Sequence, residues 1–261
     1  MDFPNIFVPI IMIPTRYFIV AGIFYLIFYK IFRNKFIYLR IQNRFPKSKT
    51  ILTEIIFSIQ TMIIFALVVI LIRYLVINKY SMIYREISDF GLIYFVFSII
   101  ILILLHDFYF YFSHKLIHHK KLFFIHKRHH LSTNPTPWSA FSFGPIEAII
   151  QIIWLPIIIL IIPLHPLSLL LWALWMMIMN VIGHLGFEIF SKNFLNSFIG
   201  KILLSSTHHN IHHSRSKSNF GLYFTFWDRI MKTEDEDYKK TYEHIKNKIN
   251  TEVKFKPQYE N

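Results

Sequence analysis

The stretch from residue 91 to residue 118, GLIYFVFSIIILILLHDFYFYFSHKLIH, joins a long apolar run to a pair of histidines. Its apolar part, Gly91 to Phe112, reaches the ~20 residues that an α-helix needs to cross a bilayer. His114 and His118 follow four residues apart, so a helix that continues would carry both on one face. The stretch therefore predicts a membrane helix that delivers two histidines to one membrane surface.

The rest of the chain has the same apolar character. Of its 261 residues, 54% are apolar and 18% aromatic, which is more than a soluble domain of this size could bury. Ile51 to Ile77 is a second run long enough to span a bilayer. Ile6 to Phe32 is interrupted by two prolines and an arginine, so we expect an interfacial piece followed by a helix from Tyr17. Pro145 to Ile182 is broken between Pro163 and Pro166, which predicts a helical hairpin.

The formal charge of +13 is distributed in a way that reports membrane topology. Basic residues follow the first apolar run, lie between His114 and His130, and recur after Gly186, whereas the loop from Asn78 to Phe90 has few. By the positive-inside tendency, the three basic regions face the cytosol. We therefore expect a multi-pass protein of a bacterial inner membrane or the endoplasmic reticulum, with its site on the cytosolic face. The charge is ascribed to anionic membrane lipids and not to nucleic acid.

Thirteen of the fourteen histidines lie between Ile101 and Ser214, and the spacing H-x-x-H-H occurs twice. On a helix, residues three and four apart share a face, so each group can converge on one point. The two groups are His126, His129 and His130, and His209, His212 and His213. Cysteine is absent, so thiolate ligands are excluded.

Eight or nine imidazoles exceed the four ligands of one tetrahedral zinc and suit two metal ions. Imidazole accepts iron, zinc, copper and nickel, so the donor type does not choose the metal. The zinc-protease element H-E-x-x-H is absent. Oxygen chemistry at a di-iron centre is favoured. The alternative is a histidine-rich membrane metal transporter or sensor, which would need ionisable residues midway through several membrane helices.

Several other polar residues could support the ligands by accepting a hydrogen bond from the far nitrogen of a ligand ring. The carboxylate candidates are Asp107, Glu147, Glu188 and Asp228. His119 and His208 adjoin better-placed histidines and are expected to have supporting roles. His106 is too far from His114 along a helix to share its ion, and we expect a structural role for His165 in the proline turn.

The order of these motifs resembles the fatty acid hydroxylase superfamily, and within it the sterol desaturase-like branch. The resemblance extends from about Phe90 to Glu234. The matching segments are His106 to His118, His126 to His130, Asn134 to Ala148, Asn180 to Glu188, Ser206 to His213 and Asn219 to Thr233. It implies an all-α fold, a polytopic membrane helical bundle with a cytosolic histidine-rich helical cap that holds a dimetal site.

The resemblance implies nine metal ligands: His114, His118, His126, His129, His130, His184, His209, His212 and His213. Asn180 stands where some relatives have another histidine, so it would bind metal through water or not at all. Gly144 also stands where many relatives have histidine. The implied organisation has three parts: residues 1–90 with N-terminal membrane segments and a basic loop, 91–233 as the catalytic domain, and 234–261 as a charged, loosely ordered tail.

The implied reaction is hydroxylation or desaturation of a lipid of sterol or fatty acyl type, with O2 as oxidant. The implied cofactor is a pair of iron ions, with zinc possible in purified protein. Electrons would come from a separate electron-donor protein or reductase, since the chain has no evident nucleotide-binding, haem or iron–sulfur motif. Hydroxylation and desaturation remain open alternatives, as does the class of lipid.

Overall fold

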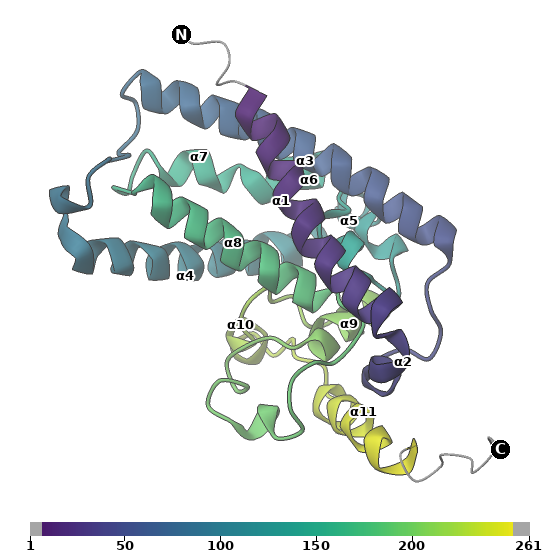
Figure 1. Ribbon diagram of the computed structural model, residues 1–261. Coiled ribbons are helices and arrows are strands. Elements are labelled where there is room, and N and C mark those ends of the chain that lie inside the picture. Colours follow the sequence, from purple (N-terminus) through teal and green to yellow (C-terminus); the bar gives the residue numbers. More distant parts are fainter. Residues whose placement is uncertain (1–6, 253–261) are drawn as a thin grey trace.

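The computed structural model describes residues 7–252, and within this range the chain forms helices and three isolated β-bridges but no strand. Four of these helices are long and apolar enough to cross a bilayer. They are α1 (Phe7–Tyr25), which continues into the π-helical η2 (Leu26–Ile31), α3 (Ser48–Ile77), α4 (Gly91–Ile117) and α8 (Pro166–Gly183) (Figure 1). The predicted all-α, polytopic bundle is confirmed.

Helix α1 differs from the prediction of an interfacial piece followed by a helix from Tyr17. It is one continuous helix from Phe7, with Pro14 inside it. Proline removes one N–H from the helical ladder, and membrane helices tolerate this because no water competes for the remaining backbone groups. The prolines were thus the wrong signal for a helix end.

The hairpin predicted for residues 145–182 is present, with a short first arm. This arm consists of α6 (Pro145–Ile152) and α7 (Trp154–Ile158), and the return arm is α8. His165 lies at the N-cap of α8, where its Nδ1 accepts from the N–H of Leu167 at 3.1 Å and its Nε2 donates to the carbonyl of Arg85 at 2.8 Å. The expected structural role of His165 is confirmed.

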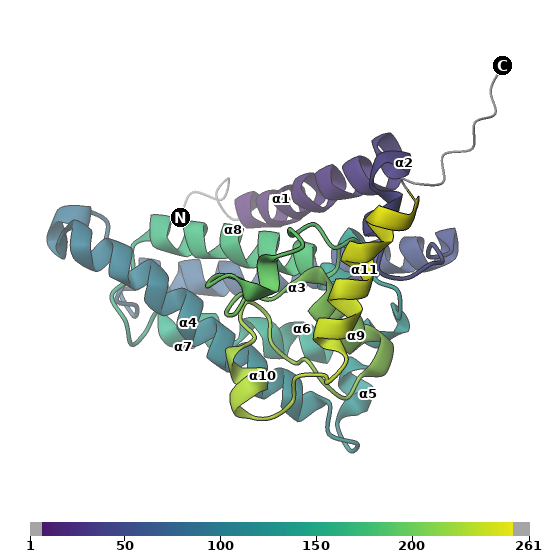
Figure 2. The same cartoon turned by 90° about the horizontal axis from the view of Figure 1, so that it is seen from below.

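The two ends of the bundle carry different segments of the chain. At one end, the loop after α3 meets the hairpin turn, since Tyr84 donates its N–H to the Leu164 carbonyl at 3.1 Å. At the other end, the basic segment near residue 40 pairs with the chain after α8, where Ile41 donates to Gly186 and Glu188 to Leu39. The histidine-bearing α5 (Phe123–His126) and α9 (Ser206–Arg215) also lie at this second end (Figures 1 and 2). All histidine motifs therefore share one end of the bundle.

The charged C-terminal segment is more ordered than the sequence suggested as far as residue 252, and the last nine residues of the predicted tail lie outside the described range. It forms α11 (Tyr238–Glu252), which packs beside α9 (Figure 2). Tyr238, Tyr242 and Ile245 are buried, and the hydroxyl of Tyr242 donates to the Ser191 carbonyl at 2.8 Å. Their spacing of four and three residues is that of an amphipathic helix, a signal that the high charge of the segment obscured.

Candidate metal centre

The histidines form two adjacent clusters. Cluster A contains His114, His118, His126, His130 and His212, and cluster B contains His129, His184, His209 and His213. In each cluster, the candidate ligand nitrogens all lie within 4.8 Å of one another. The structure thus brings together all nine residues that the resemblance implied, and no other histidine of the described chain belongs to either cluster.

In each cluster, one Nε2 atom lies within hydrogen-bond distance of several others. In cluster A, Nε2 of His130 lies 3.1 Å from Nε2 of both His118 and His212. In cluster B, Nε2 of His184 lies 3.2, 3.1 and 3.0 Å from the Nε2 atoms of His129, His209 and His213. A single ring nitrogen cannot form hydrogen bonds with three others at once.

The hydrogen bonds of Nδ1 in three of these histidines show that the lone pair of each ring is on Nε2. Nδ1 of His114, His184 and His212 lies 2.7–2.8 Å from the carbonyl oxygens of Phe220, Asn180 and Ser218. A carbonyl only accepts, so Nδ1 must carry the proton, and in the neutral ring Nε2 then carries a lone pair. Lone pairs that face one another repel unless a cation lies between them. The donor set therefore fits metal ions.

Carboxylate support comes from one residue predicted from the sequence. Glu147 on α6 places Oε1 2.5 Å from Nδ1 of His126, and both side chains are buried. An acceptor at the far nitrogen fixes the orientation of a ligand ring and raises its basicity. Helix α6 thus holds a ligand of cluster A from the membrane side of the centre.

The expectation that each H-x-x-H-H group converges on one point is wrong. His126 and His130 enter cluster A while His129 enters cluster B, and His209 and His213 enter cluster B while His212 enters cluster A. Within α9, this division follows from helix geometry, because consecutive residues are about 100° apart around the axis and residues four apart only about 40°. In the first motif, the chain passes from the end of α5 into the 3-10 turn His129–Leu131. Each motif therefore contributes ligands to both clusters.

Burial keeps the histidine rings neutral, and neutral imidazole is the form that binds metal. It lowers the pKa of His130 to about 3 and that of His184 to about 4, and it holds the pKa of His126, His209 and His213 well below the ordinary histidine value. Neighbouring histidines add to this effect for most of these rings, because a second positive charge would be repelled. The clusters are consequently neutral at pH 7, as ligation requires.

The other predicted supporting carboxylates act on the backbone and not on a ligand ring. Asp228 accepts from the N–H groups of Phe220 and Gly221, both at 2.8 Å, and so holds the peptide whose carbonyl binds His114. Asp107 accepts from the N–H groups of Tyr223 and Phe224. These two carboxylates fix the segment between α9 and α10 (Phe226–Ile230).

Glu188 positions α9, the helix that carries three of the nine cluster histidines. Its Oε2 accepts from the N–H and the hydroxyl of Thr207 at 2.9 and 2.7 Å, in the first turn of α9. Ser205 caps the same helix by accepting from the His208 N–H. Negative groups and side-chain acceptors at a helix N-terminus satisfy N–H groups that have no intrahelical partner.

The remaining polar candidates have different surroundings. Asn180 supports His184 through its backbone carbonyl, while its side-chain amide donates to the Ala140 carbonyl at 2.7 Å. His208 is fully buried outside the clusters, with Nε2 3.7 Å from Oδ2 of Asp228. His119 is exposed, so its expected supporting role is wrong. His106 lies outside both clusters and its Nδ1 bonds with the Tyr223 hydroxyl at 2.7 Å.

Some supporting groups gave no signal in the sequence. Three are backbone carbonyls, which every residue has. A fourth is Ser216, whose Oγ lies 2.9 Å from Nδ1 of His130 and whose φ of 59° places it in the left-handed region at the end of α9. Only the fold selects such groups.

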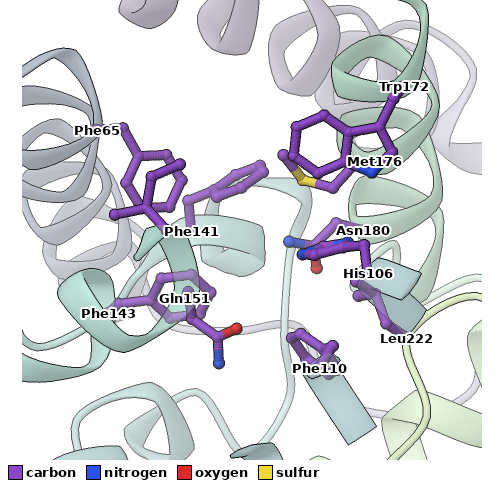
Figure 3. A pocket seen from close by; sticks show the side chains of 11 residues that line it. Phe65, His106, Phe110, Phe141, Phe143, Gln151, Trp172, Met176, Asn180 and Leu222 are labelled. Atoms are coloured by element: carbon purple, nitrogen blue, oxygen red, sulfur yellow. The ribbon is translucent and has the colours of Figure 1, made fainter. Parts of the chain in front are cut away.

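Two cavities lead away from the centre into the bundle. The inner cavity, of about 20 Å³, is lined by 11 residues from several helices and connecting segments (Figure 3). It adjoins both clusters, since the Phe110 ring packs on His114 at 4.9 Å and the Phe143 ring on His129 at 5.1 Å. The outer cavity, of about 220 Å³, is lined by apolar residues and by Arg16. Both are lined by Phe65, Ile152, Trp172 and Met176.

Comparison with known proteins finds relatives among sterol oxidases and desaturases. Lathosterol oxidase of Homo sapiens is 30% identical over 180 residues, which cover 68% of this chain and 58% of that protein. The rat enzyme of the same name is 29% identical over the same shares. A Delta(7)-sterol 5(6)-desaturase of Gibberella zeae is 27% identical over 153 residues, 58% of this chain and 46% of that protein.

The chain therefore spans about half the length of the curated relatives it matches. No solved structure matches it. The profile of the family described as fatty acid hydroxylase matches residues 99–233, just over half of the chain and the region that contains both clusters. With the sterol desaturase relatives, this match confirms the resemblance, and the chain belongs to the fatty acid hydroxylase family, in its sterol desaturase-like branch.

Proposed function

We propose that this chain is a membrane-bound di-iron enzyme that uses O2 to hydroxylate or desaturate a lipid. The observation that carries the proposal is the pair of histidine clusters, with inward lone pairs, beside an apolar cavity inside a membrane bundle. The sterol substrates in the relatives' names make a sterol the first lipid class to test.

Cluster A would supply five ligands to one ion and cluster B four to the other. Two nitrogens bound at about 2.1 Å and about 90–100° apart around one ion are separated by about 3.0–3.2 Å, while a tetrahedral ion separates them by about 3.4 Å. The nearest Nε2 pairs lie 3.0–3.2 Å apart. This spacing supports a coordination number above four. It therefore favours iron over a four-coordinate structural zinc.

The two irons would supply the reduction of O2 and the oxidation of an unactivated C–H bond. Hydroxylation takes one O2, two electrons and two protons and yields an alcohol and one water. Desaturation takes the same inputs and yields an alkene and two waters. Both therefore need an external two-electron donor.

The chain's own side chains would bind the lipid and keep water out. Phe65, Phe141 and Phe143 lie on one side of the inner cavity, and Trp172 and Met176 on the other (Figure 3). Removing an apolar lipid from the bilayer into such a site costs little, because both surroundings are apolar. Selectivity must then come from the shape of the cavities and from the few polar groups that line them.

A basic surface at the metal end supports a separate electron donor. Lys120 and Lys121 are exposed there between the first two histidine motifs, and Lys127 is exposed within the second motif. An acidic carrier would be steered to this surface by its charge. By the positive-inside tendency, this end of the bundle would face the cytosol.

Lipid mass spectrometry tests the proposal. Cells that make the intact protein are compared with cells that make His212→Ala, and metal is measured in both purified proteins. We expect a lipid that has gained one oxygen or lost two hydrogens only with the intact protein. His119→Ala is the matched control, because His119 is exposed and outside the clusters. Metal uptake into vesicles without any lipid product would favour a transporter and contradict the proposal.

A further inference from the structure

The inner cavity contains a buried amide that has no partner. Gln151 is 6% exposed, and in the described part of the chain neither its Nε2 nor its Oε1 makes a hydrogen bond. Of the other polar side chains of this cavity, Asn180 donates to the Ala140 carbonyl and His106 bonds with the Tyr223 hydroxyl, while Nε1 of Trp172, a donor only, also has no partner among the described residues. The Gln151 amide faces the open centre of the cavity (Figure 3).

A glutamine that only filled space would be a poor choice at this position. Burying an amide without a hydrogen-bond partner opposes folding, and an apolar residue of similar size would avoid that cost. The next residue, Ile152, lines both cavities and is apolar. The unpaired amide of Gln151 therefore indicates a ligand that completes its hydrogen bonds.

The position of Gln151 places that ligand next to the metal centre. It lies four residues after Glu147 on α6, so both side chains are on one face, and Glu147 holds His126. Phe110 and Phe143, which also line the inner cavity, pack on one ring of each cluster. A group bound to Gln151 would thus be close to the carbon that reacts.

We propose that the Gln151 amide binds a neutral hydroxyl or keto oxygen of the lipid substrate, near the carbon that is oxidised. This inference rests on the proposed function and specifies its substrate class. An amide both donates and accepts, which matches an alcohol. No lysine, arginine, aspartate or glutamate lines the inner cavity, so an ionised headgroup would lie there without a counter-charge. The apolar remainder of the lipid would extend toward the outer cavity.

The test compares two lipids that differ by one hydroxyl. Binding of radiolabelled 5α-cholestan-3β-ol and 5α-cholestane is measured with the full chain in lipid nanodiscs, for the wild type and for Gln151→Leu. We expect the wild type to bind the alcohol about tenfold more tightly, the value of one neutral hydrogen bond. Gln151→Leu should lower the ratio of the two affinities, alcohol over cholestane, to about one. The affinity for cholestane itself should stay unchanged or increase.

Gln60→Leu is the matched control, since Gln60 on α3 also has an unpartnered Nε2 but lines neither cavity. It should leave the ratio at about ten. Melting temperatures and metal content verify that each variant is folded and loaded.

Three outcomes would overturn the inference: equal binding of both lipids by the wild type, an unchanged ratio in Gln151→Leu, or loss of metal in Gln151→Leu. The last would show that Gln151 serves the unpartnered Oε2 of Glu147 and not a lipid. If the wild type oxidises lipids while Gln151→Leu keeps the preference, only the role of Gln151 fails. If the wild type oxidises no lipid, the proposed function fails.

Discussion

His129 and His130 are consecutive in the chain, yet their rings enter different clusters. Nε2 of His130 lies 3.1 Å from Nε2 of His118, and Nε2 of His129 lies 3.2 Å from Nε2 of His184. His212 and His213 divide in the same way. The two sites are therefore joined by short stretches of backbone.

This division predicts separable metal losses. His130→Ala should lose mainly the ion of cluster A and His129→Ala mainly the ion of cluster B, so each variant should fall from about two metal ions per chain toward one. Mass-spectrometric metal analysis of purified protein measures the ratio. His119→Ala should keep both ions, and two full equivalents in either cluster variant would contradict the assignment of that ligand.

Glu147→Gln should weaken metal binding at cluster A while leaving the fold intact. The amide can no longer offer an anionic acceptor to Nδ1 of His126, now 2.5 Å from Oε1. Replacing such a partner of a ligand typically costs about 10–100-fold in metal affinity. Competition with a chelator measures the change. Glu243→Gln, a change of an exposed side chain on α11, is the control, and equal affinities in the two variants would argue against a role for the Glu147 carboxylate.

Stability of the metal-free protein should fall as the pH decreases below about 6.5. In the unfolded chain histidine protonates near that pH, whereas burial lowers the pKa of His130 to about 3 and of His184 to about 4 in the folded protein. Between these values the unfolded chain binds more protons, so the free energy of unfolding decreases with falling pH. Bound metal should reduce the effect. A melting temperature that is constant from pH 7 to 4.5 would contradict this account.

Glu188→Leu should destabilise the protein by loosening α9. The change leaves the N–H and hydroxyl of Thr207 and the N–H of Phe190 without their acceptor. Unpaired buried donors cost about 1–3 kcal/mol. Thr207→Val removes only one of these bonds and should cost less. Unfolding in mixed detergent measures both, and a larger loss for Thr207→Val would place the anchoring elsewhere.

Met176→Trp should obstruct both cavities. Met176 lines each of them, together with Trp172 and Phe65, so a larger side chain there would reduce the volume of both. We expect lipid oxidation to fall more than tenfold, with full metal content, because neither cluster includes Met176. Met176→Leu keeps a similar volume and should remain active. Full activity of the tryptophan variant would mean that the lipid reaches the centre by another route.

The sequence alone determined the class of fold and the set of histidines. Long apolar runs have one stable arrangement in a bilayer, the helix, so α3 and α4 followed from composition. The histidine motifs are local patterns, and their order was enough to indicate the family. Periodicity was also sufficient for α11, although its charge concealed it.

Tertiary structure decided how those histidines are shared and what supports them. His129 joins His184 because the 3-10 turn that carries it packs against the end of α8, a contact that no local pattern encodes. The acceptors at Phe220, Asn180 and Ser218 are carbonyls that every residue carries. The unpaired amide of Gln151 stands out only because the packed helices exclude water from it. Contacts between distant segments set these features, because burial and direction are properties of the folded chain.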